Sequence, residues 1–400
     1  MAARRSIDTA ERRARIGARH HLAPRHRIDD VVRITDDVVA LHSTDPVSVY
    51  LSAAARMQHP SLEALTTALY EDRALVRHHS MRRTLWVFTP EVARIAHAST
   101  TVGLLTNQRR TLINLLEECG EFEDPAAWLE GAKRDALAAL HRLGPSSART
   151  LGKAVPALAT KLHLAPGKSY AADVAAHTRI LLLLGFEGAI IRTRPTGSWV
   201  SGEYTWAVAD DWLAGGLTGR VADADPMEAT GELAARWLGA FGPAPASDLQ
   251  WWTGWNGRVT AAAIARAGGT EVDLDDGTGW VRADDVDRVD DPGPWVALLP
   301  GLDPTTMGWK SRDWFLSAGV NRAVFDRNGN GGPTIWVDGR AVGTWVQRPT
   351  GEIVTGLIED VGADRETAIE EAAAQLQLLL GETRFKTRFP APMQADLLRE

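Results

Sequence analysis

The chain has 400 residues, of which 44% are hydrophobic and 24% charged, and its formal net charge is −7. This mixture is typical of soluble globular proteins of two or three domains and excludes a mostly disordered chain. No apolar run of about 18 residues predicts a membrane span, and the first residues lack a secretory signal's apolar stretch. Cys119 is the only cysteine, which excludes an intrachain disulfide and a Cys-rich metal site. We therefore expect a cytoplasmic protein.

Charge and tryptophan are unevenly distributed along the chain. An acidic protein is a poor general coat for DNA, but residues 1–28 hold eight arginines and only two acids. A locally basic surface on an acidic protein can still bind DNA in one groove. Of the 15 tryptophans, 13 follow residue 190. Most are expected to pack in the core, and a few to line a groove where bases stack.

The first 90 residues predict helices followed by a strand. Apolar spacing favours helices over 6–20 and 28–41. Asp45-Pro46 then starts a helix that runs to Met57, because Asp is a good N-cap and Pro fits the first turn. Another helix follows over 61–72, and residues 84–88 form a β-type run. Helices followed by a strand match the outline of a winged helix.

An internal repeat follows. The pattern Gly-Pro-x-x-Ala-x-x-Leu begins at Gly144 and again at Gly242, 98 residues later. In each copy an apolar helix precedes the Gly-Pro pair, and a further helix and a hairpin follow it. The hairpins are predicted over 188–208 and 272–281. This is again the order of a winged helix, and the length of the repeat indicates duplicated domains rather than a solenoid.

The pattern changes to strands after Pro294. Five strands are predicted, and Asp338-Gly339 is a strong hairpin signal between two of them. The predicted strands are 295–299, 322–325, 333–337, 343–347 and 353–357. One long helix over 366–380 follows. We therefore expect an α+β protein whose last part is a small barrel or sheet closed by a helix.

Five motifs, in order, resemble the winged-helix DNA glycosylases of the AlkZ/YcaQ type. The family typically shows Leu-Gln-x-Gln-Asp-Pro and Met-Arg-Gly-Thr-Leu-His where this chain has its first two motifs. The remaining three are a Phe-Gly-Pro…Asp-Leu-x-Trp-Trp segment, a Leu-Leu-Pro-x-x-Asp-Pro segment and a late hairpin. The motifs occupy 41–46, 81–86, 241–252, 298–304 and 338–345. Their order and spacing together make the resemblance fairly specific, and it covers nearly the whole chain.

The resemblance implies three tandem winged helices and a C-terminal β-barrel-like domain in a C shape. The three implied winged helices span 1–120, with the catalytic loop, 121–225 and 226–293. The implied β-domain spans 294–400. The implied activity is a monofunctional DNA glycosylase, a hydrolase of base excision repair that removes bulky N7-alkylguanine or N3-alkyladenine. Self-resistance to a DNA-alkylating antibiotic is a role found in the family. The implied partner is double-stranded DNA carrying alkylated purines, bound by a monomer associated with the nucleoid, without cofactor.

The matching catalytic positions are His42, Thr44 and Asp45, where the family has a Gln-x-Gln or Gln-x-Asp pair before the Asp. An N7-alkylated purine already carries positive charge, so it leaves without a strong general acid. The enzyme must instead stabilise an oxocarbenium-like sugar with a carboxylate and hold a water. A neutral His42 is able to accept a proton from that water. The alternative is that Asp45 only caps a helix and His42 is structural.

Candidate DNA-binding residues lie before and within the predicted strands. Arg82 and Arg83 precede the strand at 84–88, where they either grip phosphates or pair with Glu71 and Asp72. The others rim the C-terminal domain, with solvated loops as the alternative; they are Trp309, Lys310, Arg312, Arg322 and Arg327. No metal site is predicted, because the His20-His21 and His78-His79 side chains diverge. The glycine-rich turn at 328–332 lacks the Lys-Ser/Thr of a phosphate loop.

Two other functions fit the same features. A DNA-binding regulator without enzymatic activity would also use winged helices, although such regulators commonly have one per chain. A protein that sequesters a planar drug would use the Trp-rich half.

Overall fold

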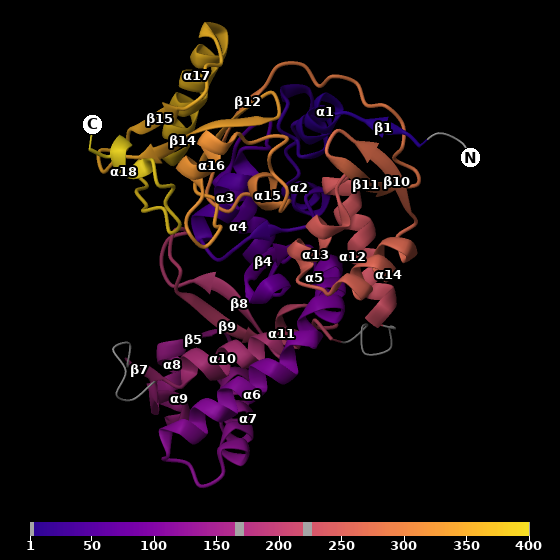
Figure 1. Ribbon diagram of the computed structural model, residues 1–400. Coiled ribbons are helices and arrows are strands. Elements are labelled where there is room, and N and C mark those ends of the chain that lie inside the picture. The colour runs from indigo at the N-terminus through magenta and orange to yellow at the C-terminus, as the bar shows by residue number, and fades with distance from the viewer. Residues whose placement is uncertain (1–3, 165–171, 219–225, 400) are drawn as a thin grey trace.

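The computed structural model describes residues 4–164, 172–218 and 226–399 and shows a mixed α+β fold. Figure 1 shows one lobe, with α6 to α10, below the N-terminal and C-terminal elements. The chain begins with β1 (Ser6–Ile7), α1 (Thr9–Arg19) and the short helix η1 (Pro24–His26). None of the described helices combines the length and apolar character needed to cross a membrane.

The same order of elements occurs three times. A helix leads into a short extended segment, at least two helices follow, and two antiparallel strands complete the unit. The first copy is α2 (Val31–Asp37), β2 (Leu41–His42), α3 (Pro46–Ala54), α4 (Leu62–Tyr70), β3 (Val76–His79) and β4 (Leu85–Phe88), with η2 (Met81–Arg83) between the last two. In this copy the short strand β2 pairs with the last strand β4.

The second and third copies contain the Gly-Pro repeat. The second is α7 (Pro125–Leu143), β5 (Ser146–Ser147), α8 (Ala148–Ala154), α10 (His177–Phe186), β8 (Ile190–Pro195) and β9 (Tyr204–Val208). The third is α12 (Pro226–Phe241), α13 (Ala246–Thr253), α14 (Gly257–Arg266), β10 (Gly269–Leu274) and β11 (Gly277–Arg282). The residues just after each Gly-Pro again pair with the last strand, at β5–β9 and at the Ala244–Trp280 bridge. Both predicted hairpins are confirmed.

Shared sheets join the copies. Strands of the first two copies form one six-stranded sheet in the order β2-β4-β3-β8-β9-β5, and one residue pair, Arg77 with Arg192, joins β3 to β8. Near the N-terminus, β1 pairs with β10 of the third copy. The connecting elements are α5 (Pro90–Ala96), the π-helical turn η3 (His97–Thr101), α6 (Val102–Cys119), α9 (Pro156–Ala159), β6 (Lys161–Leu164), β7 (Ala172–Ala175) and α11 (Ala209–Trp212).

The C-terminal part is an open sheet, which corrects the expected barrel. Its four antiparallel strands have the order β12-β13-β14-β15, and α17 packs against both edge strands. The bounds are β12 (Val296–Leu299), α15 (Pro304–Met307), α16 (Ala318–Val324), β13 (Thr334–Val337), β14 (Arg340–Gln347), β15 (Ile353–Leu357), α17 (Ala363–Leu380) and α18 (Gln394–Leu397). The hairpin at Asp338-Gly339 and the long helix are confirmed.

The strand predicted over 322–325 is wrong, because these residues lie at the end of α16. Ser317 caps this helix by accepting a hydrogen bond from the Val320 amide. Val320 and Val324, four residues apart, are both fully buried on one face. The helical spacing of these two valines therefore outweighs their β propensity.

The aromatic core confirms that most tryptophans are structural. Trp309 is 2% exposed, and its indole N–H donates to the Phe241 carbonyl at 2.9 Å. Its ring makes edge contacts with Phe241 and Trp314 at centroid distances of 5.2 and 5.1 Å. Trp309 therefore does not lie on the surface, and we remove it from the DNA-binding candidates.

One fully buried ion pair connects the first copy to the C-terminal part. Arg56, just after α3, donates to both carboxylate oxygens of Asp303 at 2.8 Å, and neither side chain is exposed. Arg56 also donates to the Ser52 carbonyl and to the Thr305 hydroxyl. Burial opposes ionisation of Asp303, but the charge and hydrogen bonds of Arg56 hold its pKa below the usual value.

We predict that Asp303→Asn destabilises the protein strongly. The substitution leaves the Arg56 guanidinium buried and uncompensated, which typically costs about 3–5 kcal/mol. Denaturant unfolding followed by tryptophan fluorescence measures the change. Asp313→Asn, at an exposed position ten residues later, is the matched control and is expected to be neutral. Equal stability of the two variants would contradict the role of the pair.

Candidate active site

The segment 42–45 forms a loop that is held at both ends. On one side, His42 pairs with Trp86 across β2 and β4, and the Ser43 amide donates to the Leu85 carbonyl at 2.8 Å. On the other side, Asp45 caps α3 and Pro46 occupies its first turn. A β-pair followed by a capped helix leaves the loop little freedom.

His42 is a neutral hydrogen-bond donor. Its side chain is buried, and its ring lies 4.5 Å from the Trp86 ring. Burial, with the charge of Arg82, lowers the pKa of His42 to about 3. Nδ1 accepts a hydrogen bond from the Thr44 amide at 3.4 Å, so the neutral ring carries its proton on Nε2. The expectation that His42 takes a proton from water is therefore not favoured, because its accepting nitrogen is engaged.

Asp45 is both a helix cap and a buried carboxylate. One oxygen accepts from the Val47 amide at 3.1 Å, and the other accepts from the Arg388 amide at 3.3 Å. Burial raises the pKa of Asp45 against these hydrogen bonds and the charge of Arg388. The helix cap predicted at Asp45 is thus confirmed, and the same side chain places a carboxylate with little access to water beside the loop.

Thr44 presents an unused hydroxyl at the same place. Its carbonyl accepts from the Arg388 guanidinium at 3.0 Å. Its Oγ1 is buried and has no hydrogen-bond partner among the described residues. A buried hydroxyl without a partner is unusual in proteins and marks Thr44 as a candidate functional group.

Arg77 supports the loop, and the sequence did not predict this role. Arg77 on β3 is 2% exposed and donates through Nε to the Ser43 hydroxyl at 3.1 Å. It also donates to the Tyr70 hydroxyl, and its guanidinium stacks on Tyr204 at 4.8 Å. A buried arginine in the run Val-Arg-His-His was the available signal, but only the pairing of β3 with β4 and β8 shows which loop it contacts.

The structure brings two of the predicted DNA-binding arginines together. Arg82 and Arg312 both stack on Trp251, with guanidinium carbons 4.1 and 5.2 Å from the ring centre. The remaining predicted cations are exposed on separate segments; they are Arg83, Lys310, Arg322 and Arg327. Glu71, named as a possible partner for Arg82 and Arg83, pairs with Arg194 at 3.6 Å instead.

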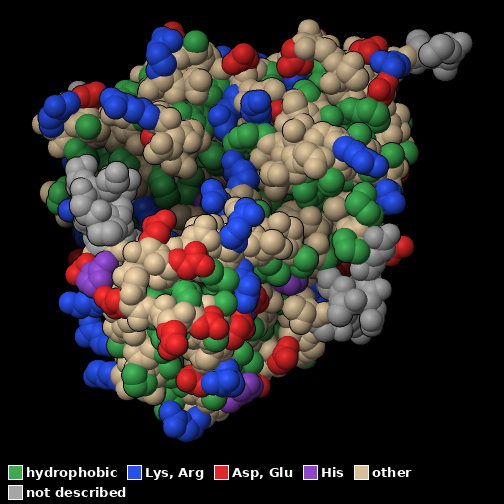
Figure 2. Space-filling model, turned by 60° about the horizontal axis from the view of Figure 1, so that its bottom comes forward, with side chains coloured by type: hydrophobic (Ala, Val, Ile, Leu, Met, Phe, Trp, Pro, Cys, Tyr) green, Lys and Arg blue, Asp and Glu red, His purple; other side chains and the backbone are tan. Residues whose placement is uncertain are grey.

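One face of the molecule carries a hollow bordered by Lys and Arg side chains (Figure 2). Figure 2 shows this hollow between the upper and lower halves, with Lys and Arg side chains extending along the middle of the face. Asp and Glu side chains gather below it. The distribution agrees with a local basic surface on an acidic protein.

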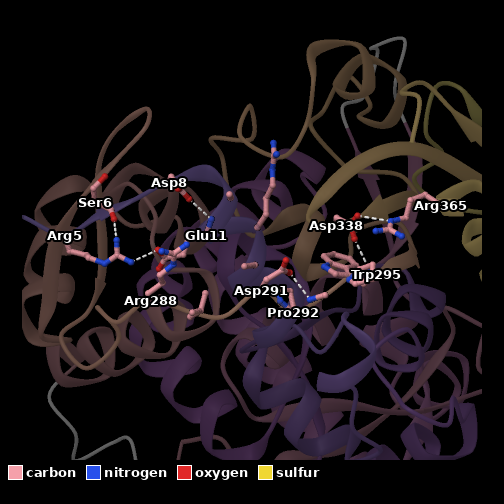
Figure 3. Close-up of a pocket in the computed structure, with 16 residues that line it drawn as sticks. Arg5, Ser6, Asp8, Glu11, Arg288, Asp291, Pro292, Trp295, Asp338 and Arg365 are labelled. Atoms are coloured by element: carbon pink, nitrogen blue, oxygen red, sulfur yellow. Dashed lines mark hydrogen bonds and ion pairs between the residues drawn. The ribbon is translucent and has the colours of Figure 1, made fainter. Parts of the chain in front are cut away.

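A separate cavity of about 640 Å³ lies between α1 and the start of β12 (Figure 3). Two ion pairs between its lining side chains neutralise part of its charge, Arg5–Glu11 and Arg365–Asp338. It contains none of the loop residues 42–45. We therefore take the loop, rather than this cavity, as the candidate active site.

The adjacent histidines diverge as predicted and are buried. His78 hydrogen bonds to His97 at 3.0 Å, whereas His79 packs against Phe186. In the described ranges no group of three or more His, Cys, Asp or Glu is placed to hold a metal ion. The histidines thus act as neutral packing groups.

We predict that the protein loses stability below pH 6.5. Burial lowers the pKa to about 3 for His20 and His42 and to about 4 for His97. Since the unfolded histidines keep a pKa near 6.5, protons favour the unfolded chain as the pH falls through this value. The free energy of unfolding is expected to drop by about 1 kcal/mol per histidine between pH 7.5 and 5.5. Denaturant unfolding at both pH values measures this.

His97→Gln is expected to weaken that pH dependence. His59→Gln, which removes a histidine whose side chain is 79% exposed, is expected to leave it unchanged. An unfolding free energy that is equal at pH 7.5 and 5.5 would show that these histidines do not govern acid stability.

Comparisons with known proteins identify the family of the chain. A family model described as DNA glycosylase AlkZ-like matches residues 35–379. The solved structure of the Streptomyces sahachiroi DNA glycosylase AlkZ matches with a TM-score of 0.69 at 18% identity, covering 96% of this chain and 99% of that chain. No curated protein matches the chain. The family match spans most of the sequence, and the chain is therefore a DNA glycosylase of the AlkZ-like family.

Proposed function

We propose that the enzyme hydrolyses the N-glycosidic bond of bulky cationic purines, either N7-alkylguanine or N3-alkyladenine. The observation that carries this proposal is the loop 42–45, which combines a buried carboxylate, an unpartnered hydroxyl and a neutral N–H donor. It contains no acid placed to protonate a neutral leaving base. The role we assign is repair of, or self-resistance to, damage by a DNA-alkylating natural product.

The proposed mechanism divides the chemistry among three side chains. Asp45 stabilises the positive charge that develops on the sugar, and this interaction is strong because the carboxylate is buried. Thr44 positions the attacking water through its hydroxyl, and His42 donates a hydrogen bond from Nε2 to that water. The electron pair of the glycosidic bond leaves with the cationic base, which departs neutral. Water forms the new bond to the sugar carbon and releases its proton to the Asp45 carboxylate, whose pKa burial raises.

The replacement of the family glutamine by His42 has a physical explanation. A glutamine amide donates a hydrogen bond without carrying charge. Because burial keeps the pKa of His42 at about 3, its imidazole is also an uncharged donor near neutral pH. In this position histidine therefore retains the property that the proposed chemistry requires.

DNA binding is assigned to the three repeated units. We propose that they are tandem winged helices in the parts 1–120, 121–225 and 226–293, arranged as a C-shaped clamp of one monomer around the duplex. The order of helices and strands and the pairing of each short segment with the last strand support this proposal. The exposed cations at 83, 310, 322 and 327 are proposed as phosphate contacts at its rim.

We predict that Asp45→Asn lowers the single-turnover rate of base release at least tenfold, about 1.4 kcal/mol in barrier. Asparagine still caps a helix but carries no charge. Asp124→Asn is the matched control, because Asp124 caps α7 and also precedes a proline. His42→Ala and Thr44→Val are expected to slow the same step. Full excision by both Asp45→Asn and His42→Ala would overturn the assignment.

We predict a strong preference for cationic lesions. Release of N7-methylguanine or N3-methyladenine from duplex DNA should be efficient, whereas uracil should remain, because a neutral base needs protonation to leave. Chromatographic detection of the free base measures both reactions under identical conditions. Efficient uracil excision would contradict the mechanism.

A further inference from the structure

Two arginines far apart in the sequence meet on one indole ring. Arg82 comes from η2, Trp251 from α13 and Arg312 from the segment after α15. Arg312 also lies over the Phe325 ring at 4.2 Å. We call Arg82, Trp251 and Arg312 the arginine clamp.

The clamp has no counter-ion. Within the described ranges neither guanidinium makes an ion pair or a hydrogen bond, and each Nε is buried without a partner. The terminal nitrogens of both arginines are not enclosed in this way, so they remain accessible to a ligand. Burial lowers the pKa of each arginine to about 10, and the charge of Arg82 contributes for Arg312. Both side chains therefore stay charged at neutral pH.

The nearest carboxylate does not fill this role. Asp248 is fully buried, and its Oδ1 accepts hydrogen bonds from the amide and hydroxyl of Ser311 at 3.0 and 2.9 Å. Its charge acts on Arg312 only through space. Asp248 therefore orients the segment that carries Arg312 and leaves the outer side of the clamp cationic.

Backbone geometry shows that the clamp is held against strain. Arg82 has φ 54° and ψ 27°, and Arg83 has φ 64°, both in the left-handed region. This conformation is strained for a residue other than glycine. Three effects oppose this arrangement: backbone strain at Arg82, the lost hydration of both guanidinium groups and the repulsion between their positive charges. An anionic ligand offsets the lost hydration and the repulsion.

The clamp lies beside the catalytic loop. The charge of Arg82 acts on His42, and the Trp86 ring contacts both His42 and Trp252, the neighbour of Trp251. The centroid distance between Trp86 and Trp252 is 5.7 Å. A ligand on the clamp is therefore close to the nucleotide under attack.

We propose that the arginine clamp binds a single DNA phosphodiester that flanks the excised nucleotide. Guanidinium groups present paired N–H donors that match phosphate oxygens, and the indole face holds both groups in place. The proposal rests on the proposed function and deepens it by assigning Arg82 and Arg312 to the same phosphate. The bound phosphate also offsets the positive potential that would otherwise disfavour a cationic sugar.

The salt dependence of duplex binding tests whether one phosphate is shared. Arg82→Gln, Arg312→Gln and the double variant are titrated with an undamaged duplex at several salt concentrations. Each single substitution should weaken binding about tenfold. The double substitution should weaken binding little more than a single one, because both arginines hold the same phosphate. In a plot of log affinity against log salt concentration, the slope of the double variant should fall by about 0.9, the value for loss of one phosphate contact. Two independent phosphate contacts would lower the slope by about 1.8. Arg134→Gln is the control, since its side chain is 78% exposed on α7.

Neutral methylphosphonate linkages locate the phosphate. They are placed one at a time around an N7-methylguanine, and binding and base release are measured separately. A methylphosphonate at one flanking position should lower the affinity of the wild type about tenfold. The same substitution should not lower the affinity of the double variant further. Trp251→Leu should resemble the double variant, and Trp251→Phe should restore binding. Additive arginine effects, or no sensitive position, would overturn the proposal. Because affinity is read without excision, absence of base release would count against the proposed function alone.

Discussion

The buried pair of Arg56 and Asp303 is the constraint on which the candidate active site depends. It connects the end of α3 to the start of α15, and the candidate active-site loop leads into the other end of α3. Because both charges are fully buried, the pair tolerates little displacement without a large energetic penalty. The Leu-Pro-x-x-Asp-Pro motif therefore supports the loop indirectly. Its Asp303 holds α3 in place, and α3 orients Asp45 at its N-cap.

Burial gives the loop its chemical character. The Asp45 carboxylate acts in surroundings where electrostatic interactions are strong, and the His42 imidazole stays uncharged. Three parts of the chain contribute: β4 packs on His42, β3 supplies Arg77 beneath Ser43, and the C-terminal segment supplies Arg388. Family membership favours a glycosylase over a regulator or a drug-sequestering protein, while the roles of the individual side chains stay predictions.

Local signals predicted much of the fold. The Gly-Pro repeat located two of the repeated units, turn residues located the hairpins, and the Asp-Pro pair located the helix after the loop. The strand expected over 322–325 is wrong because a short apolar segment such as Ala-Val-Phe suits a strand as well as a buried helix face. The predicted barrel is wrong because the number of strands does not determine whether a sheet closes.

Long-range pairing explains what the sequence could not show about the site. The motifs placed His42, Thr44 and Asp45 together, since they are adjacent in the chain. The contact of Arg77 with Ser43, the meeting of Arg82 and Arg312 on Trp251 and the burial of Trp309 all depend on tertiary contacts. Residue type alone therefore assigned Trp309 to the surface and overlooked Arg77.

The junction between β3 and β8 has a mechanical consequence. A single residue pair, Arg77 with Arg192, continues the sheet from the first copy into the second. The pairings on either side of it, β3 with β4 and β8 with β9, each run over several residues. Because Arg77 also donates to Ser43, the residue that continues the sheet also supports the candidate active-site loop. The placement of the second copy's sheet and the placement of Ser43 are therefore linked through one side chain.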